Sequence, residues 1–516
     1  MKKRAEYLET NHYLKLLVKS SAFVFFAVII SKIASYGYKI IIARYFGAET
    51  YGLFTLAVIL ISVTSSIATL GLGEGLVRYV SFYRGRKRFG HIRKLVSSSR
   101  NLFLLASLVC MGLLIVFAPT LSEKVFHEEK FSGLLIGMAI AIPFIALSNL
   151  YLGILKGFER IRAYSTLVNI YQNTARFVFI GLLVLIGIGA IAISISYVLM
   201  FIGLFILSRH YAKKDLNKMP SSKIPEYNKI MPGVLAYAWP LIFVGVLYSV
   251  FYWIDSLFLG YFLDAKTVGL YSAAVTIISL FGIAPDLFMQ LLFPLISFKF
   301  SEGKKEIIRN LTQQVVKWIY LLNIPLFLLL FLFSEQWLWL LFGGEFLIAG
   351  NILKILCFGA IFSSLVGVST SLISISGKTK LVLKDFLAFT IINILMNLLL
   401  VPSYGMVGAA IATTITQLFF ALTVIVQIKR IYGFNIIKNY IRRLIVLMII
   451  LLVMGIYFIK NIEISLNMSI LFSVIIMVVY LVSIYLLKLF NEEDKNIVMS
   501  ILLKTKNIKF KAKSNT

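Results

Sequence analysis

The sequence is poor in the residue types on which metal sites and many active sites depend. Its two cysteines, Cys110 and Cys357, both lie inside apolar runs and give no sign of a disulfide framework. Its four histidines lie in termini or loops without metal-ligand spacing, and no Gly-rich phosphate loop ending in Lys-Ser/Thr is present. We therefore expect no catalytic residues, no metal site and no bound cofactor, and we predict that the chain is not an enzyme.

Acidic residues are also scarce, because 22 Asp and Glu stand against 51 Lys and Arg. In a soluble protein the formal net charge of +29 would suggest a nucleic-acid partner. Here, however, 60% of the residues are hydrophobic, against about 45–50% in soluble domains. The apolar runs reach about 20 residues, the length of a membrane-spanning helix, and at that length only helices satisfy the backbone in lipid. The sequence predicts an all-α polytopic membrane protein with no nucleic-acid partner.

Charge clusters and Gly or Pro turns divide the chain into fourteen apolar segments. These are residues 16–43, 51–77, 95–118, 131–155, 164–186, 189–208, 234–260, 267–297, 312–333, 346–374, 381–401, 405–428, 441–459 and 466–490. Lys and Arg gather in alternate loops, which the positive-inside rule assigns to the cytoplasm. We expect about 14 transmembrane helices in a cell (plasma) membrane, with both termini cytoplasmic.

The chain repeats one design. Residues 31–54 and 248–271 each join an apolar run bearing charged and tyrosine side chains to a glycine-bearing turn, and the segments 189–192 and 408–412 share a Gly-Ala pattern about 220 residues apart. An even number of helices per copy gives both copies one orientation. The predicted organisation is two six-helix lobes, 1–208 and 233–428, in parallel repeat around a central cavity. A cytoplasmic linker, 209–232, joins them, and 429–516 adds helices 13 and 14 and a basic cytoplasmic tail.

Isolated polar groups in these runs suggest that they line a water-filled, cationic cavity, since charge in hydrocarbon is costly and usually marks function. Helical spacing of i, i+4 and i+7 places three residues of the first segment on one face, and the same spacing recurs in the fifth. The predicted cavity residues are Lys32, Tyr36, Lys39, Asn169, Asn173, Arg176, Tyr252 and Lys354. The alternative is that the lysines snorkel and the amides join helices as packing contacts.

Three acidic residues, Glu74, Asp255 and Asp286, are the candidates for gating or ion coupling. Lys39 and Asp255 occupy near-equivalent positions in the two copies, close to the outer ends of their helices. We expect them to approach each other when an outer gate closes, and structural pairing within each lobe is the alternative. Without a nucleotide site, the energy source is expected to be a Na⁺ or H⁺ gradient or the membrane potential.

The segment ARYFGAETYGLF at 43–54, followed by LGLGEG at 70–75, resembles the polysaccharide-transport (oligosaccharide flippase) family of the multidrug/oligosaccharidyl-lipid/polysaccharide exporter superfamily. The later segments 254–260 and 268–274 are similar to the second lobe of the same family. The resemblance covers essentially the whole chain. It implies fourteen helices in two lobes, alternating access and the export of polyprenyl-linked sugars.

The residues agree with that implication. A polyprenyl-(pyro)phosphate-linked oligosaccharide has an anionic headgroup, which Lys32, Lys39 and Arg176 could hold by charge-assisted hydrogen bonds. Arg176 is the first choice because its planar fork matches phosphate oxygens. We expect a flippase that works as a monomer among membrane lipids and glycan-assembly enzymes. A cation-coupled multidrug exporter and a peptidoglycan-precursor flippase of the same superfamily remain the alternatives.

Overall fold

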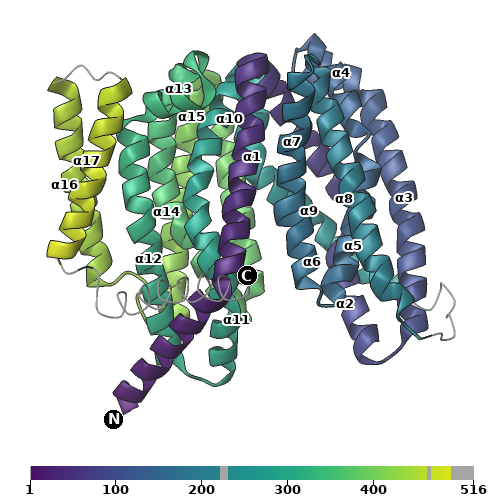
Figure 1. The fold of residues 1–516 in the computed structure, drawn as a ribbon, viewed down its shortest axis with the longest axis horizontal. Helices are drawn as coiled ribbons and strands as arrows, with labels where there is room; N and C mark the ends of the chain where they lie inside the picture. The colour runs from purple at the N-terminus through teal and green to yellow at the C-terminus, as the bar shows by residue number, and fades with distance from the viewer. Residues whose placement is uncertain (1, 221–230, 462–465, 488, 490–516) are drawn as a thin grey trace, which may run out of the picture. The chain divides into compact units, whose positions relative to one another are not determined.

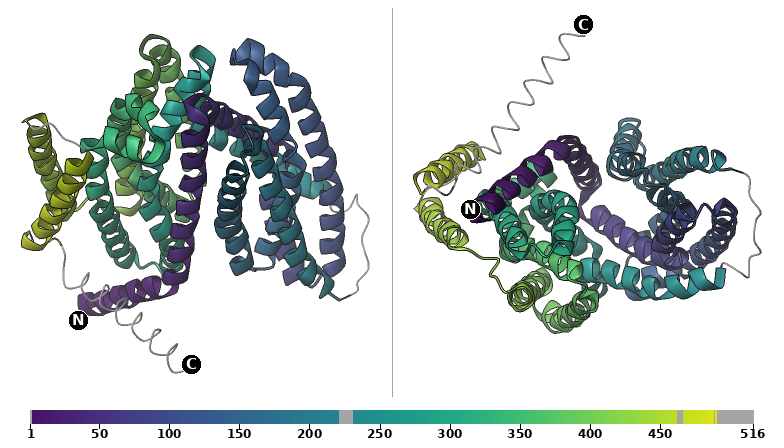
Figure 2. Two further views of the ribbon diagram at one scale, coloured as in Figure 1. Left: turned by 45° about the horizontal axis from the view of Figure 1, so that its top comes forward. Right: turned by 90° about the horizontal axis from the view of Figure 1, so that it is seen from below.

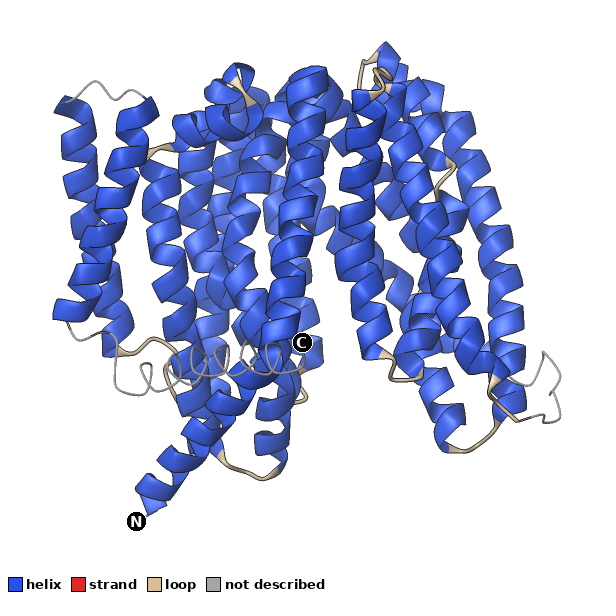
Figure 3. Cartoon of the chain, viewed as in Figure 1, coloured by secondary structure: helices blue, strands red, loops and turns tan. Residues whose placement is uncertain are grey.

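The computed structural model describes the backbone of residues 2–220, 231–461, 466–487 and 489. Part of the predicted linker, residues 221–230, and most of the predicted basic tail, residues 490–516, lie outside the described residues. Every regular element in the described part is a helix, with no strand (Figure 3). Figure 1 shows the helices in their order along the chain.

The helices follow one another with short connections. Their bounds are α1 (Lys2–Ala68), α2 (Leu72–Gly85), α3 (Phe89–Thr120), η1 (Leu121–Val125), α4 (Glu129–Ala139), α5 (Ile142–Gly157), α6 (Ile161–Ser165), η2 (Thr166–Tyr171), α7 (Gln172–Leu185), α8 (Ile191–Asn217), α9 (Met231–Phe262), α10 (Ala265–Ile278), η4 (Ser279–Gly282), α11 (Ile283–Ser301), α12 (Lys305–Leu332), α13 (Ser334–Phe342), η5 (Gly344–Ala349), α14 (Gly350–Ile375), α15 (Thr379–Tyr432), α16 (Asn439–Asn461) and α17 (Leu466–Leu486).

The helices agree with the predicted membrane segments. Within the described residues, ten helical stretches are long and apolar enough to cross a membrane, and α9 and α17 contain the shorter apolar stretches Val250–Phe262 and Leu471–Leu486. Two of the ten, in α1 and α15, contain a glycine with non-helical backbone angles, Gly47 and Gly405, so each carries two predicted segments. The chain is an all-α, multi-pass membrane protein.

The chain forms two compact units. Unit 1 comprises Met1–Phe26, Ala273–Met396 and Val407–Thr516, and unit 2 comprises Ala27–Ser272 and Asn397–Met406. Unit 2 therefore holds α9 and the start of α10 together with residues 27–208 of the predicted first lobe. The predicted boundaries of the two six-helix lobes stay a prediction.

In unit 2, helix α5 is the centre of the packing. It lies against α2, α3 and α8, and its side chains from Leu150 to Leu155 are all buried. Helix α7 packs on α8, and α9 packs on α2, as the two views of Figure 2 illustrate. A continuous apolar run such as α5 is expected where a helix is surrounded by other helices.

The two sequence repeats meet each other inside unit 2 through a backbone contact between α1 and α10. A Cβ atom added to Gly52 would overlap the carbonyl oxygen of Ala265, and one added to Gly269 would overlap the carbonyl oxygen of Ala48. Gly52 and Gly269 hold matching places in the two copies, each followed by leucine and an aromatic residue. Small residues allow such close helix approach in membranes, where close van der Waals packing is a main source of association.

Unit 1 is organised around α12, which contacts α11, α14, α16 and α17. Its buried polar groups find partners on those neighbours. The side-chain nitrogen of Asn323 donates to the carbonyl oxygen of Phe281 at 3.1 Å and to the hydroxyl of Ser364 at 2.8 Å, and the Tyr480 hydroxyl donates to the Leu321 carbonyl at 3.0 Å. Unpaired polar groups in an apolar interior are costly, so these bonds fix the register of the helices.

The glycine contact leads to a testable prediction. Gly52→Ala forces α1 and α10 apart, and overpacking of this kind costs about 1–3 kcal/mol. We expect a clear fall in the thermal midpoint, measured as the loss of the monodisperse peak in size-exclusion chromatography after heating. Gly133→Ala is the matched control, because nothing lies within 4 Å of a Cβ atom added there. Equal midpoints for the two variants would contradict the tight contact.

Candidate functional site

Helices α1 and α7 run side by side in parallel register, and this contact builds the candidate site. A Cβ atom on Gly37 would lie 2.6 Å from the ring of Phe177, and one turn further along both helices a Cβ atom on Gly181 would lie 4.0 Å from Ile41. At the other end of the contact, the side-chain nitrogen of Asn173 donates to the Ser31 hydroxyl at 2.8 Å. The polar faces predicted on the first and fifth segments therefore lie together.

Arg176 sits among aromatic rings from two other helices. Its guanidinium carbon lies 4.8 Å from the ring centre of Tyr38 on α1, and 4.9 Å and 6.0 Å from those of Tyr197 and Phe201 on α8. One of its terminal nitrogens, Nη1, also donates to the Tyr38 hydroxyl at 2.9 Å. We call these three rings the aromatic cage. They stabilise the cation through the negative faces of the rings without neutralising its charge.

The two lysines of α1 share the electrostatic environment of Arg176. Lys32 and Lys39 are both half-buried, and Lys39 lies within electrostatic range of Lys32, Tyr38 and Arg176. Within the part of the chain that the structure describes, no ion pair joins Lys32 or Arg176 to a carboxylate, and the Nε atom of Arg176 is buried without a hydrogen-bond acceptor. The three predicted cations therefore lie near one another on one face formed by α1 and α7.

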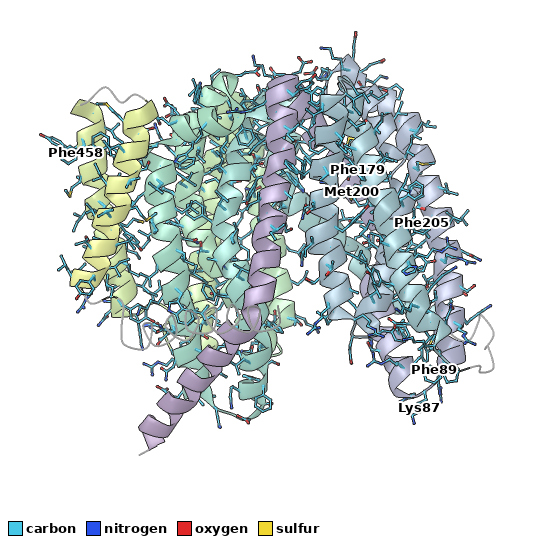
Figure 4. The ribbon with its side chains drawn as sticks, in the orientation of Figure 1. Lys87, Phe89, Phe179, Met200, Phe205 and Phe458 are labelled. Atoms are coloured by element: carbon cyan, nitrogen blue, oxygen red, sulfur yellow. The ribbon has the colours of Figure 1, made fainter. Side chains whose placement is uncertain are left out.

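The amide groups of this face lie beside a local break in helix geometry. Asn169 belongs to the π-helix η2, and its side-chain nitrogen donates to the Ser165 hydroxyl at 2.9 Å. The next helix presents Gly203, where an added Cβ atom would overlap the hydroxyl of Tyr171. π-Helical turns are rare and frequently occur at functional sites. Figure 4 labels Phe179 and Met200, which follow Arg176 and Tyr197 by one turn on α7 and α8.

Asp255 is held by hydrogen bonds within unit 2. Its Oδ2 atom accepts a bond of 2.6 Å from the Tyr271 hydroxyl, and its Oδ1 atom accepts one of 3.0 Å from the side-chain nitrogen of Asn397. These bonds tie α9 to α10 and to the middle of α15. The approach of Asp255 to Lys39 at an outer gate stays a prediction.

The remaining predicted residues are spread over the chain. Tyr36 is half-buried on α1, Tyr252 on α9 is 54% exposed, and Asp286 near the start of α11 is exposed. Lys354 lies in unit 1 on α14, with its Nζ atom 3.6 Å from a carboxylate oxygen of Glu335. Glu74 lies on α2, and its side chain is outside the described residues. The structure thus brings together the predicted residues of α1, η2 and α7, and it places Lys354 and Asp286 in the other unit.

Two sets of residues were not predicted, one at the site and one in unit 1. The aromatic cage went unnoticed, although Tyr38 is adjacent to Lys39. In unit 1, Asp385 is 8% exposed, and its Oδ1 atom accepts a bond of 3.0 Å from the Gln427 amide, while its Oδ2 atom is buried without a partner among the described residues. A carboxylate inside the apolar run 381–401 was the available signal.

Among the residues that the structure describes, no group of three or more His, Cys, Asp or Glu side chains could hold a metal ion. The arrangement offers cations, amides and hydroxyls, which can bind an anion and a polar ligand. The predicted residues that this arrangement brings together do not include a nucleophile paired with a base.

Comparison with known proteins decides the family. A family model described as "Polysaccharide biosynthesis protein" matches residues 17–299, which is more than half of the chain. The chain belongs to the polysaccharide biosynthesis protein family. A second model, MatE, matches residues 240–399 of this family member. The family resemblance predicted from residues 43–54 and 254–260 is confirmed.

This member of the polysaccharide biosynthesis protein family is similar to named transporters. It is 24% identical over 419 residues to a putative O-antigen transporter of Shigella flexneri, covering 79% of this chain and 96% of that protein. It is 26% identical over 387 residues to the probable low-salt glycan biosynthesis flippase Agl15 of Haloferax volcanii, covering 72% and 75% of the two chains. A solved structure of the lipid II flippase MurJ, in an inward closed conformation, matches with a TM-score of 0.70 at 19% identity, covering 91% of this chain and all of that one.

The aromatic cage leads to a prediction about stability. Tyr38→Phe removes the hydroxyl that accepts from Arg176 and leaves a second guanidinium nitrogen without an acceptor, which costs about 1–3 kcal/mol. We expect a lower thermal midpoint for this variant than for Tyr45→Phe, the control on the same helix, whose side chain is 54% exposed. If Tyr38→Phe matched the control, the bond to Arg176 would contribute nothing to the fold.

Proposed function

We propose that this protein moves a lipid-linked oligosaccharide from the cytoplasmic to the outer leaflet of the cell membrane by alternating access. The observation that carries the proposal is the α1–α7 face, where three cations lie together inside apolar helices. A polyprenyl phosphate or pyrophosphate headgroup is anionic, and an anion relieves the cost of keeping several positive charges at this depth. The similarity to an O-antigen transporter and to a glycan biosynthesis flippase supports the same cargo class.

The structure suggests different tasks for the three cations. Arg176 is already enclosed by the aromatic cage and donates to Tyr38, so it serves to raise the local positive potential and to hold α1 against α7. Lys32 and Lys39 are half-buried on flexible stems and can reach a phosphate. Arg176, the first choice from the sequence, is thus assigned to holding α1 against α7, and the lysines are the proposed phosphate ligands.

The other parts of the ligand have chemistry that this family member can accommodate. Asn169, Asn173 and Ser31 offer amide and hydroxyl groups at the same face, which suit sugar hydroxyls. The polyprenyl tail remains in the lipid beside the helices. On this proposal the energy comes from a Na⁺ or H⁺ gradient or the membrane potential, both termini are cytoplasmic, and the protein acts as a monomer that catalyses no covalent change.

The second candidate is flipping of a peptidoglycan precursor. Its support is the fold similarity to the lipid II flippase MurJ, and the required headgroup chemistry is the same. A cation-coupled multidrug exporter, to which the MatE match points, fits less well because the α1–α7 face repels cationic drugs. A transport assay with different lipid-linked sugars distinguishes the oligosaccharide flippase from the peptidoglycan-precursor flippase, and a protein that moves neither sugar would leave the exporter.

The decisive experiment reconstitutes the purified chain in liposomes that carry a fluorescent polyprenyl-pyrophosphate oligosaccharide, and it measures the fraction that becomes accessible to an external quencher. Lys32→Gln with Lys39→Gln removes both phosphate ligands, and hydrogen bonds to charged groups are worth about 1.5–3 kcal/mol. We expect the initial rate to fall about tenfold or more. Lys378→Gln with Lys380→Gln, at exposed positions where α15 begins, should leave the rate unchanged.

Three outcomes would contradict the proposal. The first is full transport by the α1 double variant, and the second is no transport of any lipid-linked sugar by the wild type. The third is faster movement of lipid II than of the oligosaccharide, which would establish the peptidoglycan alternative.

The proposed gate between Lys39 and Asp255 has its own test. Asp255→Lys should abolish transport, and the exchange Lys39→Asp with Asp255→Lys should restore part of it if the two charges meet during the cycle. Asp255→Asn separates the structural role, because the amide oxygen still accepts from Tyr271 while the charge is lost. If the exchange fails to restore transport and Asp255→Asn transports normally, Asp255 has no gating role and serves only to bind Tyr271 and Asn397.

A further inference from the structure

Unit 2 contains a second cationic site, formed where the start of α3 approaches the end of α8. A pocket of about 400 Å³ lies there, and its polar lining residues are Arg93, Ser97, Arg100, Tyr151, Lys213 and Asn217. None of them belongs to the α1–α7 face. Figure 1 shows both helix ends at the same end of unit 2, and Figure 4 labels Phe89, the first residue of α3.

The pocket is built by regular helices. Arg93, Ser97 and Arg100 follow one another at i, i+4 and i+7 on α3, and Lys213 and Asn217 follow at i and i+4 on α8, so each helix presents one face. Helix α5 packs against both α3 and α8. The positions of the cations are therefore fixed by the core of the unit.

No carboxylate of the described residues neutralises the positive charge of this pocket. Arg93 donates from Nη2 to the carbonyl oxygen of Met219 at 2.8 Å, which positions its guanidinium. Among the described residues, no carboxylate pairs with Arg93, Arg100 or Lys213, and Asp215 on α8 is taken by Arg160 at 2.6 Å. A concave surface with uncompensated cations concentrates anions.

Exposed apolar side chains continue both faces away from the pocket. Leu104 and Leu108 follow Arg100 by one and two turns on α3 and are 41% and 44% exposed, and Ile206 precedes Lys213 by two turns on α8 and is 56% exposed. These surfaces are lipid-facing in a membrane protein. A ligand that uses the whole surface has an anionic head and an apolar tail.

We propose that this pocket binds the phosphate group of an anionic phospholipid, whose acyl chains lie along the exposed faces of α3 and α8. The pocket lies where cationic loops gather, on the side predicted to face the cytoplasm, and basic pockets at that depth attract anionic headgroups. The bound lipid links the start of α3 to the end of α8.

The test uses the full-length chain, delipidated in neutral detergent, and native mass spectrometry with phosphatidylglycerol, phosphatidylcholine or inorganic phosphate as the probe. Arg100→Glu with Lys213→Glu reverses the pocket, and Arg162→Glu with Lys380→Glu makes the same change in net charge at exposed positions elsewhere. We expect one phosphatidylglycerol per chain, with a dissociation constant raised about tenfold or more in the pocket variant and unchanged in the control. Ser97→Trp, which fills the pocket without changing its charge, should also weaken the binding.

Equal affinities of the pocket and control variants for phosphatidylglycerol would overturn the proposal. So would equal binding of phosphatidylcholine by the wild type, since that lipid has no net charge. Complete displacement of the lipid by inorganic phosphate would identify a site for a soluble anion instead. If the charge-reversed variant fails to fold, Ser97→Trp takes its place, and unchanged phosphatidylglycerol binding by Ser97→Trp would overturn the proposal.

Discussion

The structure depends on how an arginine is kept charged inside an apolar helical bundle. A carboxylate beside Arg176 would stabilise it and cancel its field at the same time. The aromatic cage of Tyr38, Tyr197 and Phe201 stabilises it while the field persists. The same contacts hold α1 and α8 on either side of α7, so the packing of unit 2 and its positive potential have a common origin. A protein that must attract an anionic headgroup, and release it again, requires this combination.

The sequence was sufficient for the helices, whereas the cavity role of the residues on the α1–α7 face stays a prediction. Hydrophobic runs, loop charge and the i, i+4, i+7 spacing depend on local chemistry, and the fourteen segments fall on helices in the described residues. The cage could not be predicted, because Tyr197 and Phe201 approach Arg176 only through the tertiary packing of α8 on α7. Asp255 shows the same limit, since one of its partners, Asn397, is 142 residues away in the chain. The π-helix η2 also escaped prediction, because its residues have ordinary helical patterning.

The excess of positive charge separates into two kinds of environment. In α1 and α7 the cations lie within apolar segments beside amides and aromatic rings, where the low dielectric strengthens their electrostatic interactions. At the start of α3 and the end of α8 the cations line an open pocket at the helix ends, and screening by salt weakens them. A ligand carried across the membrane requires the first environment, whereas a lipid that stays in one leaflet requires only the second. The two proposed sites can therefore differ in ligand although phosphate recognition is proposed for both.

The contact between the repeats explains how the lysine face could change without disrupting the core. Beyond Lys32 and Lys39, α1 reaches Gly47, whose φ of 84° is a conformation that glycine adopts readily. The helix then continues to Gly52, which lies against α10. The part of α1 before Gly47 is fixed to α7 by Gly37 and Ser31, and the part after it is fixed to the second repeat. A change of backbone angles at Gly47 alone alters the angle between these two parts. Because the backbones at Gly52 and Gly269 lie in close contact, the part of α1 after Gly47 is held against α10, and a change of angle at Gly47 would move the lysine face relative to that contact.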